Sequence, residues 1–257
     1  MRPEKLTHPP LIEAILEVRW QLQQQAPGVA VDPKYKLLVG RLYDRLSRDY
    51  PFYEPLPTAS MPDEMLGYVV QHRFRTADGA WPLVQVGPGL VTLNDTRDYT
   101  WKAFEAKSRQ LVDALYSAYP DADTTLQVGS LQLRYIDAIP FDFATADVFQ
   151  FLAENLKITL AFSPALFTDV PVKPAPKGLN AMVEFSTANP SGTLRIRLAH
   201  GKHQGADALI LEMVLISDDS DAPDMPAGFV AWLNAAHNVI HDTFFKMIEG
   251  HLEEQFL

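Results

Sequence analysis

The sequence predicts an α+β protein in which long amphipathic helices cover one or more curved antiparallel sheets. Three observations predict this class. Several segments alternate apolar and polar residues, a pattern of period two that is typical of strands with one buried face. Strand segments without a helix between them are joined by short connections, which favours antiparallel pairing. Long segments with apolar residues at spacings of three and four indicate helices that pack on a sheet.

The N-terminal part predicts one strand and one helix. In residues 11–21 the apolar side chains fall on one side of a strand, and most polar side chains fall on the other. Asp32-Pro33 then predicts a helix start, because aspartate is a good N-cap residue and proline is favoured at the first helical position. This helix is expected to continue to about Tyr50.

Ten further elements are predicted along the chain. The first half continues with strands at residues 67–76, 81–86 and 89–94 and a helix at about 100–119. The second half contains a strand at 126–139, a helix at 145–156, strands at 181–186, 193–200 and 208–217, and a helix at about 226–249. Gly87-Pro88-Gly89 is either a tight turn or a bulge in one bent strand. Asp224 is the expected N-cap of the last helix.

Both halves of the chain follow the order strand, helix, three strands, long helix. This order predicts an internal duplication, with a first α+β half at residues 1–122 and a second at residues 123–257. The alternative is one continuous α+β domain without symmetry. A length of 257 residues is compatible with either arrangement.

The composition excludes several classes of function. The formal net charge is -10 at pH 7 and the sequence pI is about 5.1, so we do not expect nucleic-acid binding, which needs a concentrated basic surface. The chain has no cysteine, which excludes thiolate metal sites and cysteine nucleophiles. The N-terminus is polar and the apolar runs are much shorter than the roughly 20 residues of a membrane helix. We therefore expect a cytoplasmic protein without a cofactor.

Short motifs spread over the chain carry a resemblance to a known family. The motifs are Pro9-Pro10-Leu11-Ile12-Glu13-Ala14, Val84-Gln85-Val86-Gly87-Pro88-Gly89-Leu90 followed by Asn94, the pair Tyr99 and Trp101, Leu133-Arg134-Tyr135-Ile136-Asp137, and Ala236-His237 with Phe244 and Phe245. The chain resembles a sporadically distributed bacterial family of about this length, for which no activity is established. The resemblance implies an accessory gene on mobile or defence-related islands. The family ends the Leu-Arg-Tyr-Ile motif with asparagine, whereas this chain has Asp137.

His237 and His241 are the candidate metal ligands. They are four residues apart on the last predicted helix, so they share a face and could bind one metal ion. A third ligand would come from His200 or His203 if the helix lies beside that predicted hairpin tip. No glutamate follows His237, so the zinc-protease helix pattern is absent. The alternative is two histidines without a ligand role at the boundary of a buried stripe.

Arg134, Tyr135 and Asp137 are candidate residues for a polar ligand. Tyr135 and Asp137 share the inward parity of the predicted strand, whereas Arg134 faces the other way. The alternative is an arginine in solvent and an aspartate that accepts hydrogen bonds at the strand end. Asn94 and Trp101 flank a polar strand-to-helix junction and complete the ligand-binding candidates, with a helix-capping turn as the alternative.

Glu212 interrupts an apolar strand. A hairpin across residues 202–205 is expected to place Glu212 opposite Arg195, where opposite charges account for it. The alternative is a general acid or base with a raised pKa.

The sequence predicts a non-enzymatic binding or accessory protein. It is expected to engage a protein partner, to associate with itself or to hold a small polar ligand, because the fold signals are many and no catalytic constellation accompanies them. The alternative is a metal-dependent hydrolase that uses His237 and His241.

Overall fold

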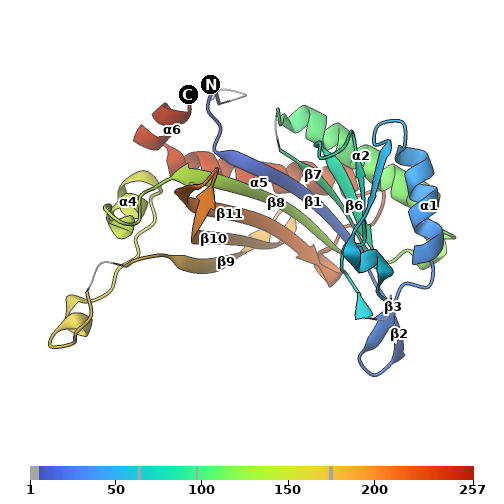
Figure 1. The fold of residues 1–257 in the computed structure, drawn as a ribbon, viewed down its shortest axis with the longest axis horizontal. Helices are drawn as coiled ribbons and strands as arrows, with labels where there is room; N and C mark the ends of the chain where they lie inside the picture. Colours follow the sequence, from blue (N-terminus) through green and yellow to red (C-terminus); the bar gives the residue numbers. More distant parts are fainter. Residues whose placement is uncertain (1–5, 63–64, 97, 174–175) are drawn as a thin grey trace.

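In the part of the chain that the structure describes, an antiparallel sheet of nine strands forms the centre of the molecule (Figure 1). The computed structural model describes residues 6–62, 65–96, 98–173 and 176–257. The strands follow the order β4-β5-β6-β7-β1-β8-β11-β10-β9, and neighbouring strands are antiparallel. The predicted α+β class and antiparallel pairing are confirmed, although the sheet is open and not strongly curled.

Several strands are longer than the predicted segments, whereas the segment predicted at residues 67–76 is a strand only at His72–Arg75. The first half contributes β1 (Leu11–Trp20), β4 (Phe52–Pro55), β5 (His72–Arg75), β6 (Leu83–Gly87) and β7 (Leu90–Asp95). The second half contributes β8 (Val128–Pro140), β9 (Asn180–Ala188), β10 (Ser191–His203) and β11 (Ala206–Asp218). The sequence pattern does not predict β4, nor the separate hairpin of β2 (Gln23–Ala26) and β3 (Val29–Val31), which projects from one end of the sheet (Figure 1).

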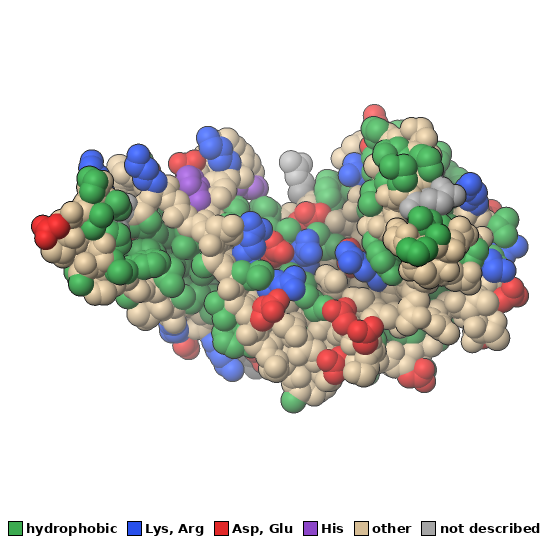
Figure 2. Space-filling view, turned by 90° about the horizontal axis from the view of Figure 1, so that it is seen from below, with side chains coloured by type: hydrophobic (Ala, Val, Ile, Leu, Met, Phe, Trp, Pro, Cys, Tyr) green, Lys and Arg blue, Asp and Glu red, His purple; other side chains and the backbone are tan. Residues whose placement is uncertain are grey.

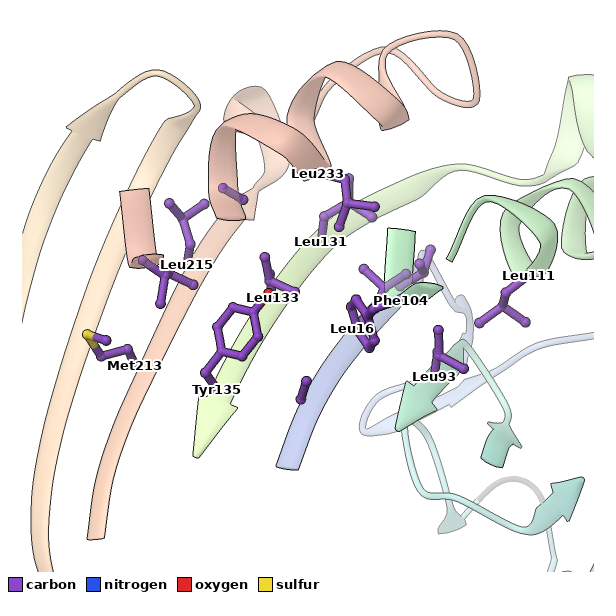
Figure 3. Packing of buried hydrophobic residues seen from close by; sticks show 14 of the residues in the cluster. Leu16, Leu93, Phe104, Leu111, Leu131, Leu133, Tyr135, Met213, Leu215 and Leu233 are labelled. Carbon is purple, nitrogen blue, oxygen red and sulfur yellow. The ribbon is translucent and has the colours of Figure 1, made fainter. Parts of the chain in front are cut away.

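The helices cover one face of the sheet. They are α1 (Tyr35–Leu46), α2 (Trp101–Ala118), α3 (Ala122–Thr125), α4 (Val148–Asn155), α5 (Phe229–Ile248) and α6 (His251–Phe256). Leu16, Leu133 and Leu215 form one row across β1, β8 and β11 and point toward the layer of α2 and α5 (Figure 3). Burial of this apolar row against the helices stabilises the packing of the two layers. Among the described residues no helix is long and apolar enough to cross a membrane.

The two halves of the chain meet at the β1–β8 pair. Leu16 lies opposite Leu133 there, so one sheet and one hydrophobic cluster extend across the predicted boundary between residues 122 and 123. In the sheet, the first half has the order β5-β6-β7-β1 and the second half has β9-β10-β11-β8. The strand orders correspond, but the first half also contains β2, β3 and β4. The duplication stays a prediction.

The expected N-cap role of Asp32 is wrong. α1 begins at Tyr35, and its N-cap is Lys34. The Asp32 carboxylate is buried, where it accepts hydrogen bonds from Trp20 Nε1 at 2.8 Å and from the Tyr119 hydroxyl at 2.9 Å, and it also accepts from the Lys34 backbone N–H. The Asp32 side chain thus binds two partners that are distant in the sequence, and α1 starts after Lys34.

The end of the chain also differs from the prediction. α5 begins at Phe229 with Gly228 as its N-cap, so the expected cap at Asp224 is wrong. The Asp224 carbonyl accepts a hydrogen bond from the Gly228 N–H at 2.6 Å, which forms a separate turn before the helix. Gly250, at φ +117°, separates α5 from α6; such a backbone conformation strongly favours glycine.

The strand pairing defines two turns that the sequence predicts, and it decides between the two alternatives for the first. Gly87 pairs with Leu90, so Pro88-Gly89 is a tight turn between β6 and β7, and Gly89 has φ +79°. His203 pairs with Ala206, which makes Gln204-Gly205 the turn between β10 and β11. This turn places Glu212 opposite Arg197, so the expected pairing of Glu212 with Arg195 is wrong by two residues.

Candidate functional site

Strand β8 separates the predicted site residues between the two faces of the sheet. Tyr135 and Asp137 are buried on the helix-covered face, whereas Arg134 points to the helix-free face, as the alternation of side chains requires. Trp101, at the start of α2, lies on the helix side with Tyr135. Asn94 of β7 lies on the helix-free face. The five predicted ligand-binding residues therefore belong to two separate groups.

On the helix side, aromatic and histidine rings form a connected cluster. The Tyr99 and Tyr135 hydroxyls are 2.7 Å apart, and the Tyr135 hydroxyl is 2.9 Å from Nδ1 of His237. The His237 ring stacks on Trp101 with ring centroids 3.7 Å apart and planes 5° apart. The centroid of the His241 ring is 5.3 Å from that of His237. The cluster joins the start of α2, the strand β8 and the middle of α5.

Burial fixes the protonation of this cluster. It lowers the pKa of His237 to about 3, and the nearby His241 lowers that pKa further, so the His237 imidazole is neutral at pH 7. Burial also raises the pKa of Tyr99 and of Tyr135, so both phenols keep their protons. A chain in which Tyr99 donates to Tyr135 and Tyr135 donates to His237 Nδ1 fits both distances and a neutral imidazole.

Asp137 is a buried carboxyl on the same face of β8. It lies between Leu11 of β1 and Leu211 of β11 and is 4% exposed. Burial raises the pKa of Asp137 from 3.8 to about 7, because the charged form loses its hydration. The inward position predicted for Asp137 is confirmed, and the side chain is not accessible to a ligand from the helix-free face.

The metal-site candidates do not gather a third ligand in the described part of the chain. No group of three or more histidine, cysteine, aspartate or glutamate side chains there could hold a metal ion. His200 stacks on Phe143, with centroids 4.0 Å apart, and its Nε2 lies 3.6 Å from Asp207. It therefore belongs to a different cluster from His237 and His241.

The helix-free face carries a band of polar and charged side chains, and charged groups gather over its middle (Figure 2). By strand pairing, the band contains Glu54, Arg73, Arg75, Gln85, Thr92, Asn94, Glu13, Glu17, Arg19, Gln132, Arg134, Glu212, Arg195, Arg197 and Glu184. The side chains of this band that come from the first half of the chain differ from those of the second half in their exposure to solvent and in their hydrogen bonds.

In the first half, the polar groups bond mainly to one another. Asn94 is 4% exposed; its Nδ2 donates to Glu13 Oε1 at 2.8 Å, and its Oδ1 accepts from Thr92 Oγ1 at 2.6 Å and Gln85 Nε2 at 3.1 Å. An amide satisfied in this way is a structural connection between β1, β6 and β7. Arg97, in the junction after Asn94, lies outside the described residues.

In the second half, the arginines reach solvent. Glu212 lies between Arg134 Nε at 3.6 Å and Arg197 Nη1 at 3.5 Å, and Arg195 Nε lies 2.7 Å from Glu184 Oε1. The side chains of Arg134, Arg195 and Arg197 are 36%, 37% and 43% exposed. We call these three residues the arginine group. Carboxylates fix their positions, and their remaining N–H donors are available to an approaching anion.

Sequence reasoning found only part of these arrangements. Glu13, Glu17 and Arg19 are polar residues at alternate positions of β1, which indicates that they point to the helix-free face. Arg195 and Arg197 are likewise two residues apart in β10. No sequence signal predicts the contact of Trp101 with His237, because it depends on how two distant helices pack. Comparison of the sequence with protein-family models and with curated proteins finds no match.

Proposed function

We propose that this chain is a non-enzymatic binding protein that holds an acidic, extended segment of a partner protein on the helix-free face of its sheet. The observation that carries this proposal is the arginine group: Arg134 on β8 and Arg195 and Arg197 on β10 are half-exposed side chains on one face, on the two strands that flank β11.

Arginine is suited to such a partner. Its planar guanidinium has five N–H donors and can bind a carboxylate through two parallel hydrogen bonds. Arg134 and Arg195 make their closest contacts to Glu212 and Glu184 through Nε, which leaves terminal N–H donors for a second carboxylate. Because these contacts already restrict the side chains, less conformational entropy is lost on binding.

The charge of the chain favours a local and salt-sensitive interaction. The formal net charge is -10 at pH 7, so an acidic segment is repelled by the molecule as a whole and attracted only where arginines gather. Screening by salt weakens such an attraction over a Debye length of about 10 Å at 0.1 M.

The shape of this face favours a protein over a small molecule. Small ligands prefer concave pockets that bury most of their surface. The arginine group lies on an open sheet, where an extended segment can contact several strands at once. We also infer that the two halves descend from one duplicated unit, which is supported by the corresponding strand orders β5-β6-β7-β1 and β9-β10-β11-β8.

Co-purification from the native host tests the proposal. We expect the wild-type chain to retain a defined protein that has an acidic segment, and Arg134→Ala/Arg195→Ala/Arg197→Ala to lose it, as measured by quantitative mass spectrometry. Higher salt should release the same protein. The matched control is Arg41→Ala/Arg48→Ala, which removes two exposed arginines on and just after α1. Identical partner profiles for the wild type and the triple variant would contradict the proposal.

A further inference from the structure

We propose that two copies of this chain pair along the outer edges of their β9 strands and so join their sheets into one continuous sheet. Among the described residues, no strand pairs with the outer side of β9, which forms one edge of the sheet in Figure 1. This inference does not rest on the proposed function, because the pairing forms through the backbone edge of β9 and not through the arginine group.

The two edges of the sheet differ in their protection against pairing. β4 has four residues and ends in Pro55. β9 has nine residues, contains neither proline nor lysine, and pairs with β10 without a bulge. Short strands, prolines, lysines and bulges are the features by which edges avoid other chains. β9 is therefore the edge that can accept another strand.

β9 also exposes large apolar side chains on both of its faces. Met182 is 57% exposed on the helix-free side, and Val183 and Phe185 are 53% and 51% exposed on the helix side. The one charged side chain of β9, Glu184, is paired with Arg195. Exposed apolar groups next to an unpaired backbone edge indicate an association surface.

The backbone of β9 sets which residues can bond to a second copy. In an antiparallel sheet, alternate residues direct their N–H and C=O groups to opposite neighbours. The His200 N–H donates to the Leu179 carbonyl at 2.7 Å, so residues in step with Leu179, including Val183, bond inward to β10. Met182 and Glu184 then direct their backbone groups outward.

A second copy of the same chain complements this edge. A twofold axis at Val183 brings Met182 of each copy opposite Glu184 of the other, and these outward-facing residues can form hydrogen-bonded pairs. The same axis places Phe185 opposite Ala181, a large side chain against a small one. An axis at Glu184 would instead place two carboxylates opposite each other, which disfavours that register.

The helix side of this edge also contains an apolar groove that the second copy would cover. The groove has a volume of about 440 Å³ and lies between α4, α5 and the β9–β10 pair. Its lining includes Ala181, Val183, Ile196, Leu198 and Met247. With the axis at Val183, Phe185 of the second copy lies opposite Ala181 and beside this groove, so pairing removes apolar surface from water as well as joining the backbones.

Disulfide trapping tests the pairing and its register. The chain has no cysteine, so Val183→Cys introduces a single thiol. Opposite residues of a non-hydrogen-bonded antiparallel pair have Cα atoms about 4.5 Å apart, within the roughly 4.4–6.8 Å that a disulfide spans. We expect Val183→Cys to form a covalent dimer under mild oxidation much faster than Phe52→Cys, a control on the opposite edge strand β4, where Phe52 is 37% exposed. Equal rates would overturn the proposal.

Molar mass in solution provides a second test. We expect the wild type to shift from monomer to dimer as concentration rises in analytical ultracentrifugation, and Val183→Lys to weaken dimerisation at least tenfold with its circular dichroism unchanged. Leu166→Lys, which changes an apolar side chain 61% exposed in the 3₁₀ turn Pro164–Phe167, should dimerise as the wild type does. The variant Arg134→Ala/Arg197→Ala, which leaves the pair of Arg195 with Glu184 in place, should also remain dimeric. The proposal would be overturned if the wild type stays monomeric at every concentration. A monomeric wild type that binds an extended peptide of another protein at β9 would overturn it as well.

Discussion

The imidazole of His237 lies flat on the indole of Trp101, with ring centroids 3.7 Å apart and planes 5° apart. The same imidazole directs Nδ1 toward the Tyr135 hydroxyl at 2.9 Å. One side chain of α5 thus connects α2 within the helical layer and β8 within the sheet. Its neutral state is necessary for this position, because a charged ring would be poorly hydrated there.

We expect His237→Ala to destabilise the chain more than His241→Ala. Loss of the His237 ring leaves the buried Tyr135 hydroxyl without this partner and removes the stack on Trp101, at a cost of about 2–4 kcal/mol. The His241 side chain is 39% exposed, and its removal should cost about 1 kcal/mol or less. Urea unfolding of both variants measures the difference. If both variants lose the same unfolding free energy, the contacts of His237 do not stabilise the chain more than those of His241.

The pKa of His237 predicts a loss of stability in acid. Its folded value of about 3 is below the ordinary 6.5, so below pH 6.5 the unfolded chain binds a proton that the folded chain does not. The contribution of neutral His237 should fall by about 1.4 kcal/mol per pH unit as the pH decreases from 6.5 toward 3. We expect unfolding free energies of the wild type and His237→Gln to converge by up to about 2 kcal/mol between pH 7 and pH 5. A constant difference over this range would contradict the assignment.

Asp137 predicts the opposite dependence. Its folded pKa of about 7 lies above the ordinary 3.8, so the folded chain holds a proton that the unfolded chain releases, and stability falls as the pH rises from 4 to 7. Asp137→Asn keeps the shape without the charge. We expect it to raise the unfolding free energy by about 2–4 kcal/mol at pH 8, and by much less at pH 4. Thermal unfolding at both pH values checks this, and a variant less stable than the wild type at pH 8 would contradict it.

Asp32 connects two aromatic side chains that are distant in sequence. Trp20 Nε1 and the Tyr119 hydroxyl both donate to its carboxylate. We expect Asp32→Ala to cost about 3 kcal/mol or more, because two buried donors lose an acceptor at once. The control is Asp44→Ala, which changes an exposed residue of α1. Denaturant unfolding of the two variants compares them, and similar midpoints would show that Asp32 has no such role.

The predicted metal site and the predicted ligand-binding cluster both required side chains from different elements to lie close together. The spacing of residues along the sequence gives no information about such distances. His237 and His241 do share a helix face, yet His200 packs on Phe143 in another cluster. Arg134 and Tyr135 are adjacent in sequence and lie on opposite faces of the sheet, a separation that strand parity predicts correctly. The sequence therefore located side chains on faces, and did not locate them next to one another.

Strand and helix positions followed from the sequence because they depend on local spacing. The alternation in β1, β8 and β11 and the apolar stripes of α2 and α5 reflect burial of one face, which a linear pattern records. The tertiary structure alone decided the continuous sheet at the Leu16–Leu133 pair, the stack of Trp101 on His237 and the spacing of the arginine group. These contacts join segments far apart in the chain, so their energy depends on the packing of whole elements and leaves no local mark in the sequence.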